Sequence, residues 1–564
     1  MSSTILLKVK QITQSLINNH SIPAILVAVF LGLTIFASQN DSVTSDETVH
    51  IPVGWIYAKY GIYKMNIEHP PLMKIISGIF LLPLNLHYPS QYPLPTEYDG
   101  TDQYPFGDSL LMYSGNNMDK ILFWGRLPAI LMTTGLMIVI YIWTKKITNS
   151  RVTGILAMVL GMNVPIILAH GRLANTDAPL TFFYLLTFYF LWIFLEKPTF
   201  KYSILLGLSM GFALASKFSA LIILPISILL ILTKIFFFRE KYYSAIKPLV
   251  LYVLSMILAV ILVWGIYLGA QRNEIFNNNA LELGASVNFR VADTLWEKIV
   301  FKPLDWYSGG LKFVINNLER YGYLNGDLRL GGHWNYFLYG LLYKTPLPML
   351  ILFLIGLFVA SFQIYKKKDS FMWLFILLPF IIYLGISAMG KLNIGVRHIM
   401  PIYPFMVIVS TMGVWTLSKK RNNLVKISTI FFVLWLMVDI AIHYPSFMGY
   451  FSQVIGSNHN NYKYLFDSDV DWLQDDQRMI KYLKSQSIGT VYMANKNKLF
   501  VFWDIDVIEI NKNSEKPPSG SYVVLSSNDK AWANNTNNAI DWIVKNKSPI
   551  HHIGYSIYLY KIQK

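Results

Sequence analysis

The sequence predicts an α-helical polytopic membrane protein with about eleven transmembrane helices, followed by a small extracytoplasmic α/β domain. Two observations carry this prediction. The 564 residues are 54% hydrophobic and only 14% charged, which is too apolar for an ordinary soluble protein. Many apolar runs also reach the roughly 17 to 25 residues that a helix needs to cross about 30 Å of hydrocarbon. Cysteine is absent, so disulfides and thiolate metal sites are excluded.

The predicted spans follow from these apolar runs. They lie near residues 22–38, 121–142, 153–170, 177–195, 203–217, 219–237, 248–269, 344–364, 371–388, 397–416 and 426–443. Two of them carry the weakest pattern: 153–170 contains Asn163 and Pro165, and 203–217 is short and rich in glycine. A further apolar segment, 75–86, is too short to span and is expected to lie in the membrane interface.

The orientation follows from lysine and arginine, which concentrate in every second short loop. These residues are Lys145, Lys146 and Arg151; Lys197 and Lys201; Lys234, Arg239, Lys241 and Lys247; Lys366 to Lys368; and Lys419, Lys420, Arg421 and Lys426. We therefore place these loops, and the N-terminus with Lys8 and Lys10, in the cytoplasm. The loop 39–120, with nine Asp/Glu against four Lys, then faces outward.

The same topology predicts two domains. Residues 1–444 form the transmembrane domain with external loops 39–120 and 271–343, and residues 445–564 form the extracytoplasmic α/β domain. Within the latter, 471–487 and 531–545 have helical spacing, whereas 490–493 and 522–525 are typical of strands. The net charge of +16 resides mainly in the cytoplasmic loops, so we expect contacts with membrane lipids and no nucleic-acid partner.

Ionisable residues of both signs collect near the outer membrane surface, where they are costly unless they have a function. They are Asp46, Glu47, His50, Glu68, His69, Lys74, Arg126, Arg172, Asp177, Lys217, His333, Lys391, Arg397 and His398. Cations in this position can neutralise a lipid-linked phosphate, and a carboxylate can act as a general base. The pattern indicates group transfer from a phospholipid carrier.

Individually, these residues also have structural interpretations. Arg126 can extend from a helix end toward the interface, Lys217 can flank a loop, and Asp177 can cap a helix. A single histidine such as His333 is commonly hydrogen-bonded inside the protein. In the tail, the D-x-D pattern of Asp467 and Asp469 is compatible with a metal-dependent sugar-nucleotide site or with helix capping.

Seven motifs occur in an order that resembles a known family. They are D-E-x-x-H from Asp46, E-H-P-P-L-x-K from Glu68, G-R-L-P from Gly125, R-L-A-N-T-D-A-P from Arg172, G-G-H-W-N-Y-F from Gly331, K-T-P-L-P from Lys344, and R-H-I-M-P-I-Y-P-F from Arg397. Together with the segment 464–472, they resemble lipid-carrier-dependent glycosyltransferases of the GT-C fold. The similar branch contains protein O-mannosyltransferases and aminoarabinose transferases of lipid A.

The resemblance implies a role for each matched residue. Asp46, with Glu47, falls at the catalytic acid; His50, Glu68 and Asp177 fall at sugar- or substrate-binding positions; and His69, Lys74, Arg126, Arg172, Lys217 and Arg397 fall at carrier-phosphate-binding or active-site-ordering positions. The aminoarabinose transferases have lysine where this chain has His69 and tyrosine where it has His50. Glu68 and His333 match residues that hold a divalent metal, such as Zn, Mg or Mn, in some members and not in others.

These implications define an expected activity and its alternatives. The chain is expected to transfer a sugar from a polyprenyl-phosphate carrier to a lipid, glycan or protein acceptor, with inversion and with Asp46 as the base, at the extracytoplasmic side of the cytoplasmic membrane. Alternatives are a transporter or flippase of lipid-linked saccharides, an envelope-assembly protein, and an oligosaccharyltransferase. Paired half-repeats and a W-W-D-Y-type motif, which would favour the first and the last, are not evident in the sequence.

Overall fold

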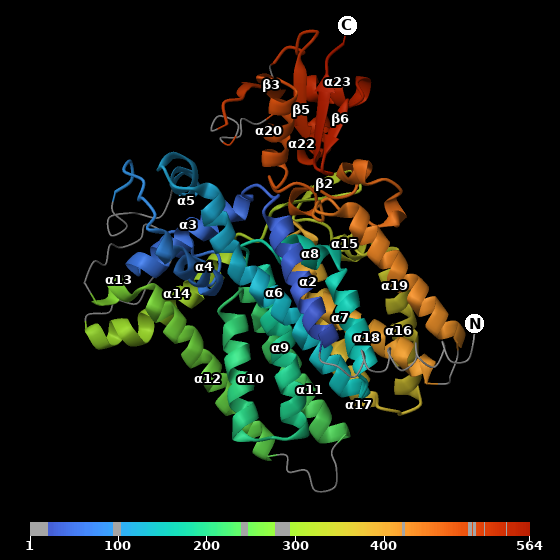
Figure 1. The fold of residues 1–564 in the computed structure, drawn as a ribbon. Helices are drawn as coiled ribbons and strands as arrows, with labels where there is room; N and C mark the ends of the chain where they lie inside the picture. The colour runs from blue at the N-terminus through green and yellow to red at the C-terminus, as the bar shows by residue number, and fades with distance from the viewer. Residues whose placement is uncertain are drawn as a thin grey trace.

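The computed structural model describes residues 21–93, 103–238, 246–276, 294–419, 423–494, 499, 503–511, 514–536 and 538–563. Long helices form the body of the molecule, and a small sheet lies beyond one end of them (Figure 1). Six of the predicted cytoplasmic cations, namely Lys8, Lys10, Arg239, Lys241, Lys420 and Arg421, lie outside the described residues.

Nine helices in the described part of the chain are long and apolar enough to cross a membrane. They are α2 (Ser21–Ser38), α6 (Met118–Thr148), α9 (Asp177–Glu196), α11 (Ile223–Phe237) with its preceding 3-10 turn from Phe218, α12 (Ile246–Ala270), α16 (Leu347–Tyr365), α17 (Ser370–Met389), α18 (Tyr403–Ser418) with its preceding 3-10 turn from Val396, and α19 (Asn423–His443). Each coincides with a predicted span, which confirms the helical membrane fold class.

The other two predicted spans are helical but differ from the prediction. Segment 153–170 is two helices, α7 (Arg151–Met162) and α8 (Pro165–His170), because Pro165 cannot donate a backbone hydrogen bond and starts a new helix. Segment 203–217 is α10 (Phe200–Leu214), which has 15 residues and packs between α9 and α12. Both helices therefore extend the bundle without meeting the length of a full span.

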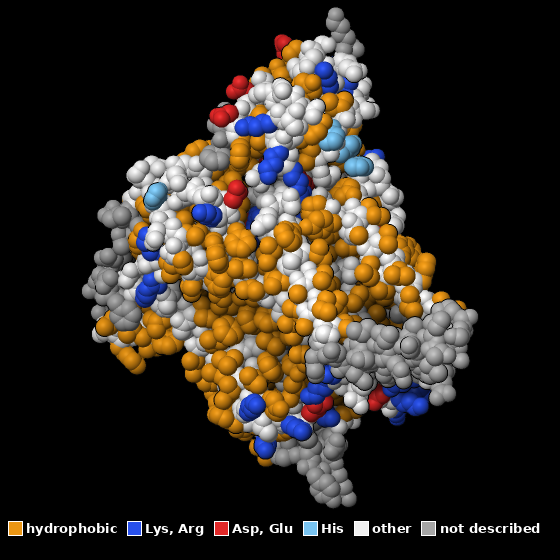
Figure 2. Space-filling view, viewed as in Figure 1, with side chains coloured by type: hydrophobic (Ala, Val, Ile, Leu, Met, Phe, Trp, Pro, Cys, Tyr) orange, Lys and Arg blue, Asp and Glu red, His pale blue; other side chains and the backbone are white. Residues whose placement is uncertain are grey.

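Hydrophobic side chains form a broad belt around the bundle (Figure 2). The helices α2, α12 and α19 contribute many of them, since only about a fifth of the residues in the apolar stretch of each helix are buried. Lysine and arginine gather below the belt, at the end opposite the sheet (Figure 2). Such a belt between two polar ends is the surface expected of a protein that spans a bilayer.

The predicted external loop 39–120 folds into short helices beside the sheet-bearing end of the bundle (Figure 1). These are α3 (Ser45–Tyr60), α4 (Leu72–Leu81) with a 3-10 turn to Leu84, and α5 (Gln103–Asp108) with a π-helical extension to Tyr113. The second loop contains α13 (Arg272–Phe276), α14 (Leu295–Asn316), the hairpin β1–β2 (Tyr321–Leu324 and Asp327–Leu330) and α15 (Tyr336–Lys344).

Helices α3 and α4 cross at two glycines. A Cβ atom on Gly54 would collide with the Lys74 carbonyl, and one on Gly78 would collide with the Gly54 carbonyl. The predicted interfacial segment 75–86 thus coincides with α4 and its 3-10 turn, held closely against α3. This contact fixes α3 and, with it, the acids of its first turn.

The C-terminal region contains a five-stranded mixed sheet in the order β4-β3-β5-β7-β6. Its strands are β3 (Thr490–Met493), β4 (Asp506–Glu509), β5 (Tyr522–Ser526), β6 (His551–Ile553) and β7 (Ile557–Lys561). The predicted helix 471–487 is the shorter α20 (Asp476–Ser485), and 531–545 divides into α22 (Ser527–Thr536) and α23 (Asn538–Asn546). The segment 445–475 connects α19 to α20 through short 3-10 turns.

Substituting Gly78 by alanine tests the α3–α4 contact. The added methyl group has no space, so we expect Gly78→Ala to lower the free energy of unfolding by about 1–3 kcal/mol. Thermal unfolding in detergent measures this change. Gly32→Ala is the control, because a Cβ atom there meets nothing within 4 Å; equal stability of the two variants would contradict the close crossing.

Candidate active site

The first turn of α3 presents two acids in different directions. A capping box starts this helix: the Glu47 carboxylate accepts hydrogen bonds from the backbone N–H and the hydroxyl of Thr44, at 3.1 and 3.0 Å. Glu47 is fully buried, whereas the Asp46 side chain is 22% exposed and accepts a 2.8 Å hydrogen bond from Nη1 of Arg397. Of the two predicted catalytic acids, Asp46 is the one that reaches open space.

Two cations flank a third acid next to Asp46. Lys217 Nζ donates to Asp177 Oδ1 at 2.6 Å, and Arg397 Nη1 lies 3.6 Å from Asp177 Oδ2. Lys217 Nζ is also 3.2 Å from Nδ1 of His398. Residues that are more than 350 positions apart in the sequence therefore form one charged cluster, in which Arg397 bridges Asp46 and Asp177.

A cavity of about 120 Å³ opens beside this cluster. Its charged and aromatic lining consists of Asp46, Glu68, His69, Tyr104, Lys217, Arg320, Arg397 and His398. Phe313, Val314 and Leu318 at the end of α14, together with Leu392 and Ile394, supply apolar walls. The cavity can therefore accommodate an anion next to a carboxylate, with apolar side chains adjoining both.

The local charges decide which groups ionise. Burial opposes ionisation of Asp46, but Arg397 and other nearby cations outweigh it, so the pKa of Asp46 lies below its usual value of 3.8. Burial lowers the pKa of His50 to about 4. Burial and the charge of Lys217 hold the pKa of His69 well below its usual 6.5. At neutral pH the site thus combines an ionised Asp46 with neutral histidines.

The predicted histidines and Lys74 have specific positions around the cavity. His50 lies behind it, with Nδ1 3.2 Å from the Ala174 carbonyl oxygen and its ring edge-on to His69 at 5.8 Å. Lys74 is buried and donates to the Asn66 carbonyl, the Asn66 side chain and the His69 carbonyl at 2.7–2.9 Å. Lys74 therefore shapes the loop that carries Glu68 and His69, while the latter two line the cavity themselves.

Residues from the C-terminal region position Arg397. The sequence predicted Arg397 but not these contacts. The Trp472 ring lies under the Arg397 guanidinium at 4.0 Å, and Asp469 accepts a 2.8 Å hydrogen bond from the Val396 N–H. Ser468 donates to the Ile394 carbonyl at 2.6 Å. The D-x-D segment is thus packed on the loop of Arg397; the family-like run 464–472 was the only signal for this role.

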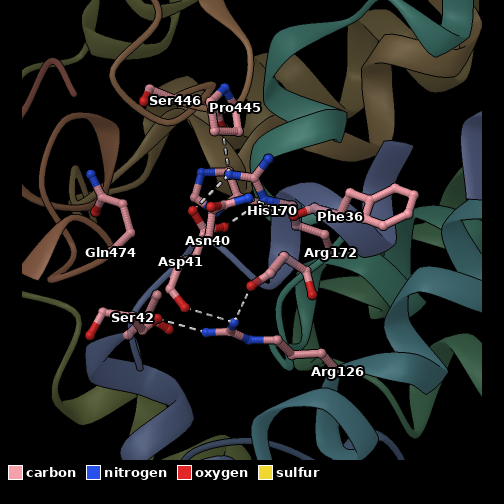
Figure 3. A network of polar contacts seen from close by, with 12 residues as sticks. Phe36, Asn40, Asp41, Ser42, Arg126, His170, Arg172, Pro445, Ser446 and Gln474 are labelled. Atoms are coloured by element: carbon pink, nitrogen blue, oxygen red, sulfur yellow. Dashed lines mark hydrogen bonds and ion pairs between the residues drawn. The ribbon is translucent and has the colours of Figure 1, made fainter. Parts of the chain in front are cut away.

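A second charged network lies behind Asp46, and within it the guanidinium of Arg126 is fully hydrogen-bonded. Arg126 donates all five N–H groups to Glu47 and to the carbonyls of Ser38, Asp41 and Ser42, at 2.6–3.0 Å. Figure 3 shows Arg126 with the Asp41 and Ser42 backbone. Glu47 also accepts the Ala174 N–H at 2.9 Å. This arrangement favours active-site ordering over phosphate binding for Arg126.

Arg172 has a similar position in this network. It contacts Asp41 through two hydrogen bonds of 2.6 and 3.0 Å and donates to the Pro445 carbonyl at 2.9 Å (Figure 3). Arg478 of α20 donates to the same Asp41 carboxylate at 2.8 Å. Asp41 therefore joins the end of α2, the loop before α9 and the C-terminal region.

The two residues of the predicted metal pair, Glu68 and His333, have separate contacts in the structure. His333 contacts Asp327, with Nε2 3.1 Å from its carbonyl oxygen, whereas Glu68 lines the cavity and is within reach of Gln103 at 3.4 Å. No group of three or more histidines or acids able to hold a metal ion occurs among the residues described. A metal site at Glu68 and His333 therefore stays a prediction.

A comparison with known families and structures is consistent with the motifs. Residues 115–267, about a quarter of the chain, match the family model described as dolichyl-phosphate-mannose-protein mannosyltransferase. This match confirms the resemblance to lipid-carrier-dependent glycosyltransferases of the GT-C fold. No curated protein matches the chain.

Three solved structures illustrate the similarity. ArnT from Cupriavidus metallidurans in the apo state shares 12% identity over 95% of this chain and 97% of its own, with a TM-score of 0.47. The Archaeoglobus fulgidus oligosaccharyltransferase AglB, in complex with an inhibitory peptide and a dolichol-phosphate, shares 11% over 90% and 69%, with a TM-score of 0.47. The S. cerevisiae Pmt1-Pmt2 complex bound to its sugar donor shares 19% over 46% and 34%, with a TM-score of 0.34. These scores are too low to support residue roles.

Replacing Glu47 by glutamine tests the ordering role. Loss of this charge leaves Arg126 buried and without its counter-ion, so we expect a loss of about 3–5 kcal/mol of stability. Unfolding in detergent measures it. Glu196→Gln, which breaks an exposed pair with Lys146, is the control and should cost no more than about 1 kcal/mol. A stable Glu47→Gln protein that lacks only activity would contradict the ordering role.

Proposed function

We propose that this protein transfers a sugar from a polyprenyl-phosphate carrier to an acceptor at the extracytoplasmic side of the cytoplasmic membrane. The observation that carries the proposal is the ion pair of Asp46 with Arg397 at a cavity that Lys217 also lines. An ionised acid and two cations are the groups that such a transfer requires. The family match over residues 115–267 supports the same class of reaction.

Asp46 acts as the general base in this proposal. One Asp46 oxygen takes the proton of the acceptor hydroxyl or amine as the acceptor atom bonds to the anomeric carbon. The bond from that carbon to the carrier phosphate oxygen breaks, and its electron pair stays on the phosphate. Attack from the face opposite the leaving phosphate inverts the anomeric configuration.

The cations stabilise the departing phosphate. Charge develops on this group in the transition state, and fixed donors in a site of low dielectric stabilise it without reorganisation. Arg397 and Lys217 already face the cavity, and Arg320 on its exposed side is a further cation that the sequence did not predict. Asp177 contacts both Lys217 and Arg397. It therefore holds these two cationic side chains near each other when no phosphate is bound.

The distribution of charge supports the proposed orientation. Figure 2 shows a group of lysines and arginines at the end of the bundle opposite the sheet, as expected for a cytoplasmic side. Glu68, His69 and Tyr104 line the cavity on the side of the loop helices and are the proposed contacts for the sugar or acceptor. The proposal names the substrates by class: a polyprenyl-phosphate-linked sugar and an acceptor with a hydroxyl or an amine.

Transfer by Asp46→Asn tests the base. We expect a loss of about 10²- to 10⁴-fold in the turnover number, because the amide cannot accept the proton. Transfer from a panel of radiolabelled polyprenyl-phosphate sugars in membranes measures it, with Glu319→Gln, an exposed acid beside the cavity, as the control. Equal transfer by wild type and Asp46→Asn would overturn this role, and movement of intact carrier without sugar transfer would favour the flippase alternative.

The pH profile gives an independent test. Since the pKa of Asp46 lies below 3.8, its carboxylate stays ionised as the pH falls from 7 to about 5. We therefore expect no loss of the turnover number over this interval at saturating carrier. A steep acidic decline centred near pH 6 would show that a group with a higher pKa is the base.

A further inference from the structure

A second, larger cavity lies at the opposite side of the Asp41–Arg126 network. Its volume is about 260 Å³, and none of its lining residues lines the active-site cavity. The end of α2, the start of α6 and the outer face of α20 enclose it, through residues that include Gln39, Asp119, Phe123, Gln477 and Lys481. Its lining thus places it between the membrane helices α2 and α6 and the helix α20 of the C-terminal region.

The cavity lies where the hydrophobic belt ends. Below it, α2 exposes Ile25, Val29, Leu33 and Phe36, each 46–62% exposed and all on one side of the helix. On α6, Trp124 is also exposed next to the lining residue Phe123. Figure 2 shows charged side chains directly above this part of the belt. An apolar surface thus adjoins a polar cavity. This arrangement matches a lipid, whose acyl chains would contact the apolar surface and whose headgroup would enter the cavity.

The polar residues at this cavity are available to a ligand. Arg126, in its floor, has no N–H left to donate. In contrast, no hydrogen bond or ion pair of the side chains of Gln39, Asp119, Gln477 and Lys481 occurs within the described ranges, although Gln477 is only 8% exposed. Within the described ranges, the rim therefore offers one cation and two amides that make no hydrogen bond, together with the Asp119 carboxylate, which interacts with the charge of Arg126 but accepts no hydrogen bond from it.

We propose that this cavity binds the headgroup of a phospholipid that carries a phosphate and a primary ammonium, as in phosphatidylethanolamine. Lys481 and Gln477 contact the phosphate, and Asp119 accepts hydrogen bonds from the ammonium. Phe123 and the exposed row of α2 contact the acyl chains. A quaternary ammonium could not donate a hydrogen bond to Asp119, and the neutral hydroxyls of phosphatidylglycerol would donate without a compensating positive charge, so the rim favours the primary ammonium.

Such a lipid would hold the C-terminal region on the membrane helices. The cavity joins α2 and α6 to α20, and Arg478 on α20 is already paired with Asp41. A ligand that binds only the folded arrangement stabilises it in proportion to its occupancy. The site does not depend on the proposed transfer reaction and acts on the stability of the assembled protein.

Lipid titration of the full chain in nanodiscs tests the proposal. Native mass spectrometry counts bound lipids, and thermal unfolding is followed as phosphatidylethanolamine replaces phosphatidylcholine at constant lipid content. We expect one preferentially retained phosphatidylethanolamine and a higher unfolding temperature. Asp119→Asn and Lys481→Gln should each weaken retention about tenfold or more, and Lys484→Gln, on the same helix outside the cavity, should not.

Other outcomes would overturn the proposal. Equal retention of phosphatidylethanolamine and phosphatidylcholine, or a preference for phosphatidylglycerol, would exclude selection by Asp119. Full competition by soluble glycerophosphoethanolamine would show a headgroup site without acyl contacts. Neither Asp119 nor Lys481 makes a hydrogen bond or ion pair with another described residue, so unchanged unfolding temperatures in pure phosphatidylcholine are expected and establish that both variants fold.

Discussion

The buried ion pair of Glu47 and Arg126 is the interaction on which the arrangement of the site depends. Arg126 on α6 reaches the carbonyls that end α2, and Glu47 on α3 reaches the backbone before α9. One pair thus fixes the relative positions of three helices and a loop. Because Glu47 points inward in the first turn of α3, its neighbour Asp46 is directed to the cavity. Burying two charges is costly, and the full set of hydrogen bonds around them offsets that cost.

The charged cluster of Asp46, Asp177, Lys217 and Arg397 at the cavity differs from the Glu47–Arg126 network in how its charges are paired. Asp177 shares its two oxygens between Lys217 and Arg397, and Arg397 also contacts Asp46. Two acids therefore balance two cations in the empty cavity. In the proposed reaction, the lipid phosphate would compete with these acids for the same N–H groups. The site is thus preorganised for an anion while its resting state remains electrically neutral, which limits the cost of keeping charges in a poorly solvated place.

The helical bundle could be predicted from the sequence, whereas the position of each charged residue within the site could not. Apolar runs of sufficient length predicted the spans directly. Only two predicted spans differ in the structure: one is broken into two helices at Pro165, and the other is the short helix α10. Charge type also identified residues that meet in space, since most of the predicted residues enter one of the two networks; their roles in the site stay a prediction. Charge type could not separate Asp46 from Glu47, because adjacent residues on a helix face different directions and packing alone decides which is buried. The contacts of Trp472 and Asp469 with the loop of Arg397 could not be predicted for a related reason, because these partners lie more than 70 positions away in the sequence.

The same long-range contacts bear on where the functional unit ends. The predicted boundary after residue 444 follows the last apolar span, yet the segment beyond it contacts the site at several points. Trp472 lies under Arg397, and the backbone of Ser42 and Ser45 donates to the carbonyls of Gln474 and Trp472 at 2.9 and 3.3 Å. These backbone bonds flank the acid-bearing turn of α3. We infer that the catalytic unit extends to the start of α20, because removing this segment would expose both Arg397 and the N-terminus of α3.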